Sequence, residues 1–322
     1  MKRRELFGFI LIAGTWPLIA SAQEPGRTFR IGIVDVVSAE LNAPNLSAFQ
    51  QGLHDFGYVE GRNLILEYRS ADGDARRFPA LIDELIGLQV DLILARGTPA
   101  ALAAKKATST IPVVMAVGEP LLIVESLARP GANVTGFSGV QPDLEPKRLE
   151  LLQEIAPATS GVAALLNMSN PVTGPQLKEL ERAAQAKRLR FRLFDVRTRD
   201  DIERAFPALG GEFDAIVVGL EALTQAHRAR IAELAMEHRL PAVYGGREFV
   251  EAGGLIFYGP SFPDIYRRAA RYVDRIFRGA RPAELPVEQP AKFGLVINGR
   301  VARALGLTIP ASLRLSADEV IE

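Results

Sequence analysis

Short apolar runs alternate with helical patterns along most of this chain. Residues 92–95 contain no polar side chain, which is typical of a strand buried on both faces of a parallel sheet. The turn Gly97-Thr98-Pro99 follows this run, and residues 100–107 favour a helix. A second apolar run at 113–117 ends at Gly118-Glu119. This pattern predicts a β–α–β unit whose two strands end in adjacent polar loops.

These two loops form a candidate binding site, because ligands of open parallel sheets bind at the carboxyl ends of the strands. Thr98 is suited to the N-cap position of the following helix. Backbone N–H groups and the Thr98 hydroxyl would then lie at the positive end of that helix and favour an anionic group. The same residues also fit an ordinary capped helix in any α/β protein.

The same alternation continues on both sides of residues 136–141, where no low-complexity linker occurs. Apolar runs predict strands at 30–36, 64–68, 92–95 and 113–117, then at 161–166, 190–196, 215–218, 241–244, 254–258 and 293–297. We therefore predict an α/β fold of two doubly wound parallel-sheet lobes joined by a hinge. The N-terminal lobe would comprise residues 28–138 plus 259–285, and the C-terminal lobe residues 139–258 plus 286–322.

Residues 1–22 have the pattern of a cleaved signal peptide. Lys2-Arg3-Arg4 is a positively charged start, residues 6–19 are mainly apolar, and Ala20-Ser21-Ala22 fits the small-residue cleavage site. The paired arginines leave both the Sec and the twin-arginine export routes open. We expect the mature protein to begin at Gln23, after cleavage behind Ala22.

Composition narrows the class of protein further. Lys+Arg and Asp+Glu both number 38, and no basic run is interleaved with aromatic residues, so nothing favours a nucleic-acid partner. The chain has no cysteine, which excludes disulfides, thiolate metal sites and a lipid tether on a cysteine behind the signal. An exported protein without such a tether is expected in a Gram-negative periplasm.

We find no set of residues with catalytic or metal-ligand spacing. The histidines at 54, 227 and 238 lack the spacing of a metal site. Ser138 lies in Gly-Phe-Ser-Gly-Val, which lacks the second glycine of a nucleophile elbow. Neither a Walker loop nor Gly-x-Gly-x-x-Gly occurs. We therefore expect no enzyme activity, no metal and no cofactor, and instead binding through backbone and hydroxyl groups.

Seven segments spread over the mature chain form a specific combination. They are residues 51–63 (QGLHDFGYVEGRN), 97–101 (GTPAA), 126–136 (SLARPGANVTG), 149–157 (LELLQEIAP), 244–254 (YGGREFVEAGG), 285–290 (LPVEQP) and 304–310 (ALGLTIP). Together they resemble the ABC transporter substrate-binding family of the tryptophan/tyrosine-binding type, which has a type I periplasmic-binding fold. The resemblance implies a periplasmic solute-binding protein that closes two lobes over a small ligand. Its implied partners are an ABC permease and its ATPase, and its implied state is a monomer.

The ligand class that this resemblance implies is an amino acid, aromatic or otherwise. For such a ligand, Thr98 and the neighbouring N–H groups would hold the carboxylate, while Glu119 or Glu221 would pair with the ammonium. Tyr244, Tyr258 or Phe137 would stack on its side chain. The full candidate set is Ser38, Gly97, Thr98, Gly118, Glu119, Phe137, Asn167, Glu221, Tyr244, Arg247 and Tyr258.

The chain departs from the family pattern in the loops that would select the ligand. Gly118-Glu119-Pro120-Leu121-Leu122 stands where the family usually has Gly-Asp-Pro-Val-Gly, and Leu220-Glu221-Ala222 replaces a Pro-Asp-Pro-like turn. Ile256-Phe257 stands where Met-Ser is common. Two other functions stay open: a periplasmic sensor partner that presents its ligand to a receptor, and a hydrolase or isomerase on the same layered fold.

Overall fold

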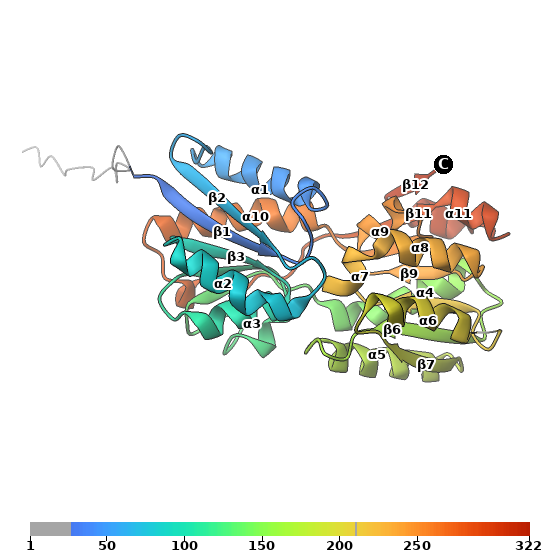
Figure 1. Ribbon diagram of the computed structural model, residues 1–322. Helices are drawn as coiled ribbons and strands as arrows, with labels where there is room; N and C mark the ends of the chain where they lie inside the picture. Colours follow the sequence, from blue (N-terminus) through green and yellow to red (C-terminus); the bar gives the residue numbers. More distant parts are fainter. Residues whose placement is uncertain (1–26, 210) are drawn as a thin grey trace, which may run out of the picture.

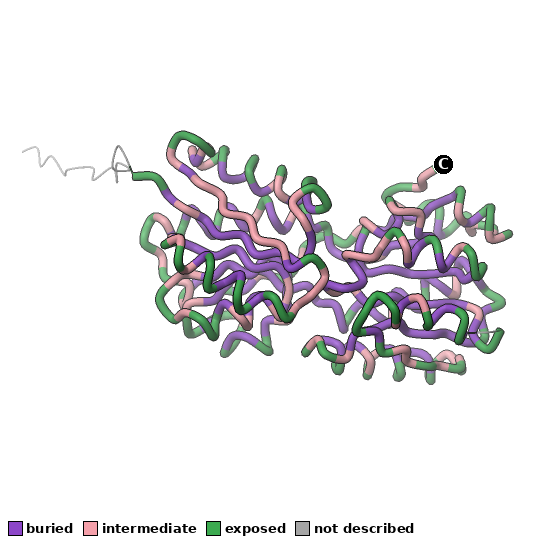
Figure 2. Tube along the Cα trace, viewed as in Figure 1, coloured by how far each residue is buried: buried purple, intermediate pink, exposed green. Residues whose placement is uncertain are grey.

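A computed structural model describes residues 27–209 and 211–322, and the predicted signal peptide lies outside the described residues. The chain folds into two lobes lying side by side, each a sheet with helices on both faces (Figure 1). In both lobes the strands form the buried centre and the outer faces of the helices are exposed (Figure 2). The predicted α/β fold of two lobes is therefore confirmed.

The N-terminal lobe contains a fully parallel sheet in the order β2-β1-β3-β4-β5. Two apolar cores lie on its two faces, one under α1 and α10 and one under α2 and α3. The strands are β1 (Phe29–Asp35), β2 (Leu64–Ser70), β3 (Leu92–Arg96), β4 (Val113–Val117) and β5 (Val134–Gly136). The helices are α1 (Ala43–Asp55), α2 (Phe78–Gly87), α3 (Thr98–Ala107) and α10 (Phe262–Phe277), with short 3-10 turns η1 (Ala75–Arg77), η2 (Pro120–Leu122) and η3 (Pro282–Glu284).

The C-terminal lobe contains a seven-stranded sheet in the order β12-β11-β10-β9-β8-β6-β7. Its strands are β6 (Gly161–Leu166), β7 (Arg190–Asp195), β8 (Ala215–Val218), β9 (Ala242–Tyr244), β10 (Ile256–Pro260), β11 (Phe293–Asn298) and β12 (Glu319–Ile321). Its helices are α4 (Gln141–Ile155), α5 (Thr173–Ala186), α6 (Arg199–Leu209), α7 (Ala222–Ala226), α8 (Arg228–Glu237), α9 (Arg247–Glu251), α11 (Gly299–Ala304) and α12 (Ala311–Ser316).

This second sheet is not fully parallel as predicted, since β10 and β11 pair antiparallel. The chain leaves β10 for the N-terminal lobe and returns from there, so β11 enters the sheet from the opposite end. β12, which the sequence pattern did not predict, then adds parallel to β11. The helical stretch between β8 and β9 is divided into α7 and α8 at His227.

The chain passes between the lobes three times: between β5 and α4, between β10 and α10, and before β11. β10 continues to Pro260 in the C-terminal sheet, two residues beyond the expected change of lobe. The last passage is also later than expected, because Val287 packs in the N-terminal core and Glu288 pairs with Phe137. Gly139 in the first connection and Phe262, which follows the second, line a cavity between the lobes.

Candidate functional site

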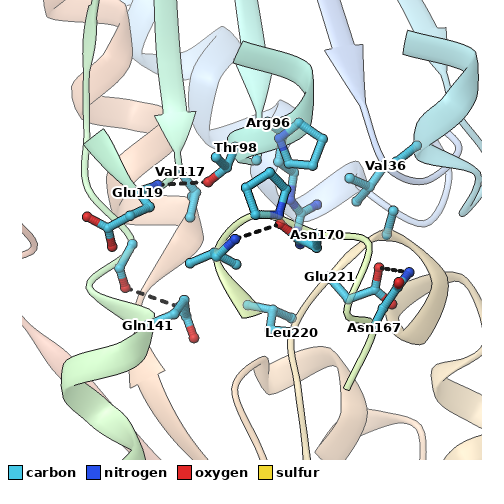
Figure 3. Close-up of a pocket in the computed structure, with 18 of the residues that line it drawn as sticks. Val36, Arg96, Thr98, Val117, Glu119, Gln141, Asn167, Asn170, Leu220 and Glu221 are labelled. Atoms are coloured by element: carbon cyan, nitrogen blue, oxygen red, sulfur yellow. Dashed lines mark hydrogen bonds between the residues drawn. The ribbon is translucent and has the colours of Figure 1, made fainter. Parts of the chain in front are cut away.

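A cavity of about 380 Å³ lies between the lobes, at the carboxyl ends of strands from both sheets (Figure 3). This volume is within the usual range for small-molecule sites. The polar lining residues are Arg76, Arg96, Thr98, Glu119, Gln141, Asn167, Ser169, Asn170, Glu221 and Gln225. The others are Val36, Ala75, Phe78, Gly97, Pro99, Leu102, Val117, Gly118, Gly139, Pro171, Val172, Leu220, Ala222 and Phe262.

The start of α3 forms part of the N-terminal wall. Gly97, not Thr98, is the N-cap residue, with a φ of +88° that favours glycine. The Thr98 hydroxyl oxygen instead accepts a 2.9 Å hydrogen bond from the N–H of Glu119 and so connects α3 to the loop after β4. Within the described residues, the N–H groups of Thr98 and Ala100 donate to no protein acceptor. An anionic group is favoured at this helix end.

Arg96 occupies the same wall at the end of β3 and is held by a buried network. Its Nη1 donates to Asn42 Oδ1 at 2.9 Å and lies 3.4 Å from Asp35 Oδ1. Asp35 also accepts hydrogen bonds from Asn42 Nδ2 at 2.8 Å and from the Tyr266 hydroxyl at 2.7 Å. Arg96 Nη2 lies 3.4 Å from Glu248 Oε1 in the other lobe. The guanidinium is therefore fixed by both lobes and is shared between two carboxylates.

Glu119 lies at the end of β4 and faces the cavity without a cationic partner among the described residues. Partial burial raises the pKa of its carboxyl, and the negative charge of Asp143 acts in the same direction. The ionised form is thus disfavoured until a positive group enters the cavity.

Glu221 faces the cavity from the C-terminal lobe as the N-cap of α7. Its Oε1 accepts from the N–H of Thr224 at 2.9 Å, the Thr224 hydroxyl accepts from the N–H of Glu221, and the pair forms a capping box. Its Oε2 accepts from Asn167 Nδ2 at 3.2 Å. Burial raises the pKa of Glu221, although these hydrogen bonds act in the opposite direction. Two carboxylates of perturbed pKa therefore line one cavity from opposite lobes.

Six residues of the candidate set line this cavity together. They are Gly97, Thr98, Gly118, Glu119, Asn167 and Glu221. All six lie within three residues of the end of a predicted strand, where parallel strands bring their loops to one edge of a sheet.

The other five candidates lie outside the cavity lining. Phe137 is fully buried in the N-terminal core, with its ring 5.1 Å from that of Tyr272. Tyr244 is fully buried in the C-terminal core and stacks on Phe249. Both rings pack between a sheet and a helix, so the stacking role expected for them needs correction.

The remaining three candidates are placed by contacts within their own lobes. Tyr258 stacks on Phe293 across the β10–β11 pair. Arg247 forms surface ion pairs with Glu251 and Glu319, and the Ser38 hydroxyl lies within the loop after β1. None of these side chains reaches the cavity, so these expectations also need correction.

The candidate set omitted several residues that the structure places in the lining. Arg96 follows a buried apolar run directly, and a charge at that position was a signal that local reasoning could have used. Leu220 and Gln141 adjoin segments already considered. Phe262 belongs to α10, and no local pattern connects it with β3.

Comparison with known proteins identifies the family. A model of the family described as ABC transporter substrate binding protein matches residues 30–321, and the chain belongs to this family. The resemblance expected from the motifs is thus confirmed. A tyrosine-binding protein of Clostridioides difficile (strain R20291) is 26% identical over 293 residues, covering 90% of this chain and 83% of that relative.

Two solved structures have similar folds over 91% of this chain and 100% of theirs. A conserved domain protein from Vibrio cholerae is 25% identical, with a TM-score of 0.85. An ABC domain from Streptococcus pneumoniae, solved in complex with L-Trp, is 26% identical, with a TM-score of 0.84. Among the described residues, we find no helix long and apolar enough to span a membrane and no metal-binding cluster of three or more His, Asp or Glu side chains.

Proposed function

We propose that this chain binds an amino acid in the inter-lobe cavity and delivers it to the permease and ATPase of an ABC importer. The observation that carries this proposal is the pairing of a helix N-terminus with two carboxylates around one largely apolar cavity. An α-amino acid presents one anionic and one cationic group, and such a cavity offers a complement to each.

In the proposed complex, the ligand carboxylate lies at the start of α3, near the N–H and hydroxyl of Thr98. The ammonium lies toward Glu119 or Glu221. The side chain of the ligand contacts the apolar lining, which includes Phe78 and Phe262. We favour an apolar or aromatic amino acid for this reason, and the relatives that bind tyrosine or L-Trp support the choice.

The family and the signal pattern at residues 1–22 support the wider role that we propose. The mature protein is a periplasmic monomer that binds and releases its ligand without catalysis. Its lobes close over the ligand and open at the permease, so that ligand binding shifts an open–closed equilibrium.

Thermal-shift measurements on residues 23–322 test this function. Each of the twenty L-amino acids is added, and any that stabilises the fold is compared with its decarboxylated amine and its deaminated acid. An amino acid at 100 times its Kd stabilises the folded state by about 2.7 kcal/mol. Both analogues should bind far more weakly. The amine lacks the carboxylate that the start of α3 would bind, and the acid lacks the ammonium that would pair with Glu119 or Glu221. A response only to other solutes would refute the amino-acid assignment.

A further inference from the structure

The lobes meet at a glycine on the rim of the cavity. Gly73 lies between β2 and η1 of the N-terminal lobe, opposite α7 of the C-terminal lobe, whose place beside the N-terminal lobe is visible in Figure 1. A Cβ atom at Gly73 would lie 2.7 Å from the Cβ of Ala226 and 3.4 Å from the carbonyl oxygen of Ala222. Ala222 itself packs with the core residues under α2 and α3. At this contact between Gly73 and Ala226, which we call the seam, the Cβ of Ala226 leaves no room for a side chain at position 73.

Neither Gly73 nor Ala226 can easily move away from this contact within its own lobe. The N–H of Gly73 donates to the carbonyl of Val36 at 2.8 Å, and the N–H of Asp74 donates to that of Ala71 at 3.0 Å. Gly73 also has a φ of +82°, which favours glycine. On the other side, Ala226 has only a Cβ, so it has no flexible end to move aside. A side chain at 73 would therefore be accommodated most easily by separating the lobes.

The seam adjoins the binding site on both sides. Ala75 and Arg76 follow Gly73 and line the cavity, while Glu221 and Gln225 belong to the α7 segment and line it from the other lobe. Separation at Gly73 would move Glu221 away from the wall that carries Thr98.

We propose that Gly73 is a positioning residue for the ligand site. Its lack of a side chain allows α7 to pack against the N-terminal lobe, and this contact completes the cavity. The inference rests on the proposed function for its ligand, but the contact between the lobes can be measured without one.

Three variants separate the contact from backbone strain. Gly73→Ala introduces the side chain. Gly61→Ala is the matched control, because Gly61 has a φ of +78° but no neighbouring atom within 4 Å of the place that a Cβ would occupy. Ala226→Gly, combined with Gly73→Ala, removes the opposing Cβ and should restore the contact.

The measurement is the distance between spin labels on Cys introduced at Lys106 in α3 and Lys178 in α5, both exposed. The chain has no cysteine of its own, so the labels attach only at these two positions. Distances are recorded for residues 23–322 without ligand and with L-tryptophan as the probe. Calorimetry measures the affinity for the same probe, and thermal melts show that each variant is folded.

We expect a short-distance population in the wild type, its loss in Gly73→Ala, and its retention in Gly61→Ala. The double variant should recover it. Affinity for L-tryptophan should fall about tenfold or more in Gly73→Ala, because apparent affinity scales with the closed fraction, and should recover in the double variant.

The distance data decide the proposal. It is overturned if Gly73→Ala keeps the wild-type distances, or if the double variant with Ala226→Gly does not recover them. It is also overturned if the wild type shows no short-distance population either without ligand or with L-tryptophan. If the wild type shows the short-distance population but does not bind L-tryptophan, the result counts against that ligand. The ligand-free distances of the variants then still test the role of Gly73.

Discussion

At the scale of single residues, Glu119 and Glu221 determine how the cavity responds to charge. They line it from opposite lobes (Figure 3), and burial raises the pKa of each above the ordinary 4.5. The folded chain therefore favours the protonated form of each carboxyl more than the unfolded chain does. Stability should fall as the pH rises from 4.5 through the raised pKa, since the unfolded carboxyls ionise first.

An ammonium-bearing ligand reverses this preference, because it stabilises both carboxylates and lowers their pKa. Binding should therefore release protons at a pH between the lowered and the raised pKa. Affinity should increase as the pH rises through that interval and become constant once both groups are ionised in the free protein. Calorimetric titrations in buffers of different ionisation enthalpy measure the protons released.

Glu119→Gln provides the control for this pH dependence. The substitution keeps the shape of the side chain but cannot ionise, so part of the pH dependence and part of the affinity at high pH should disappear. An affinity that is flat or falls with pH in the wild type would contradict the assignment of the ammonium to these carboxylates.

At the scale of secondary-structure elements, the start of α3 and the loop after β4 act as one unit. The Thr98 hydroxyl joins them by accepting from the N–H of Glu119, and Thr98 is only 4% exposed. This contact sets the position of a backbone that carries one of the two cavity carboxylates. Thr98 therefore has a structural role as well as the proposed contact with the ligand.

Thr98→Val should affect both stability and binding. It preserves the side-chain shape but leaves the N–H of Glu119 without its acceptor, at a cost of about 1–3 kcal/mol. Affinity for the amino acid found in the screen should fall about tenfold or more, since a hydrogen bond to the carboxylate is lost and Glu119 is displaced. Urea unfolding and calorimetry measure the two effects.

Thr98→Ser is the matched control, because it keeps the hydroxyl and loses only a methyl group. It should bind nearly as well as the wild type. Equal affinities for the Val variant and the wild type would remove the Thr98 hydroxyl from the site.

At the scale of the whole molecule, few charged contacts join the lobes within the described residues, and Arg96 makes the most buried of them. Asp35 and Asn42 hold it in the N-terminal lobe, and its Nη2 lies 3.4 Å from Glu248 Oε1 in α9. Arg96 keeps its partner Asp35 when the lobes separate, so opening leaves no unpaired arginine at this position. The Glu248 contact is available to favour the closed arrangement.

Glu248→Gln should weaken ligand binding by favouring the open arrangement. The Glu248 side chain is 20% exposed, so the contact is partly screened and its loss should cost about three- to tenfold in affinity. Calorimetry at low and moderate salt measures the change, which should be larger at low salt.

Glu251→Gln on the same helix is the control, since Glu251 pairs with Arg247 at the surface and takes no part in the contact between the lobes. It should leave affinity unchanged. If the two variants behave alike, the ion pair between the lobes does not contribute to closure.

The local pattern of apolar and polar residues predicted much of the fold, and about half of the candidate site residues that it indicated line the cavity. The apolar runs of β3 and β4 and the polar turns behind them predicted that Thr98 and Glu119 lie together, because parallel strands end at one edge of a sheet. The same reasoning brought Asn167 and Glu221 to the matching edge of the other lobe. These features depend on periodicity and short-range geometry, which a sequence records directly.

The tertiary structure alone decided the features that depend on distant segments. Phe137 and Tyr244 were expected at the cavity, but the packing of helices against each sheet turned both rings into the cores. The network around Arg96 needs Tyr266, which α10 brings back to the N-terminal lobe from far along the chain. The approach of Gly73 to Ala226 likewise exists only when the lobes meet. Such contacts arise from the burial of apolar surface between elements that share no local pattern, so only the assembled molecule determines them.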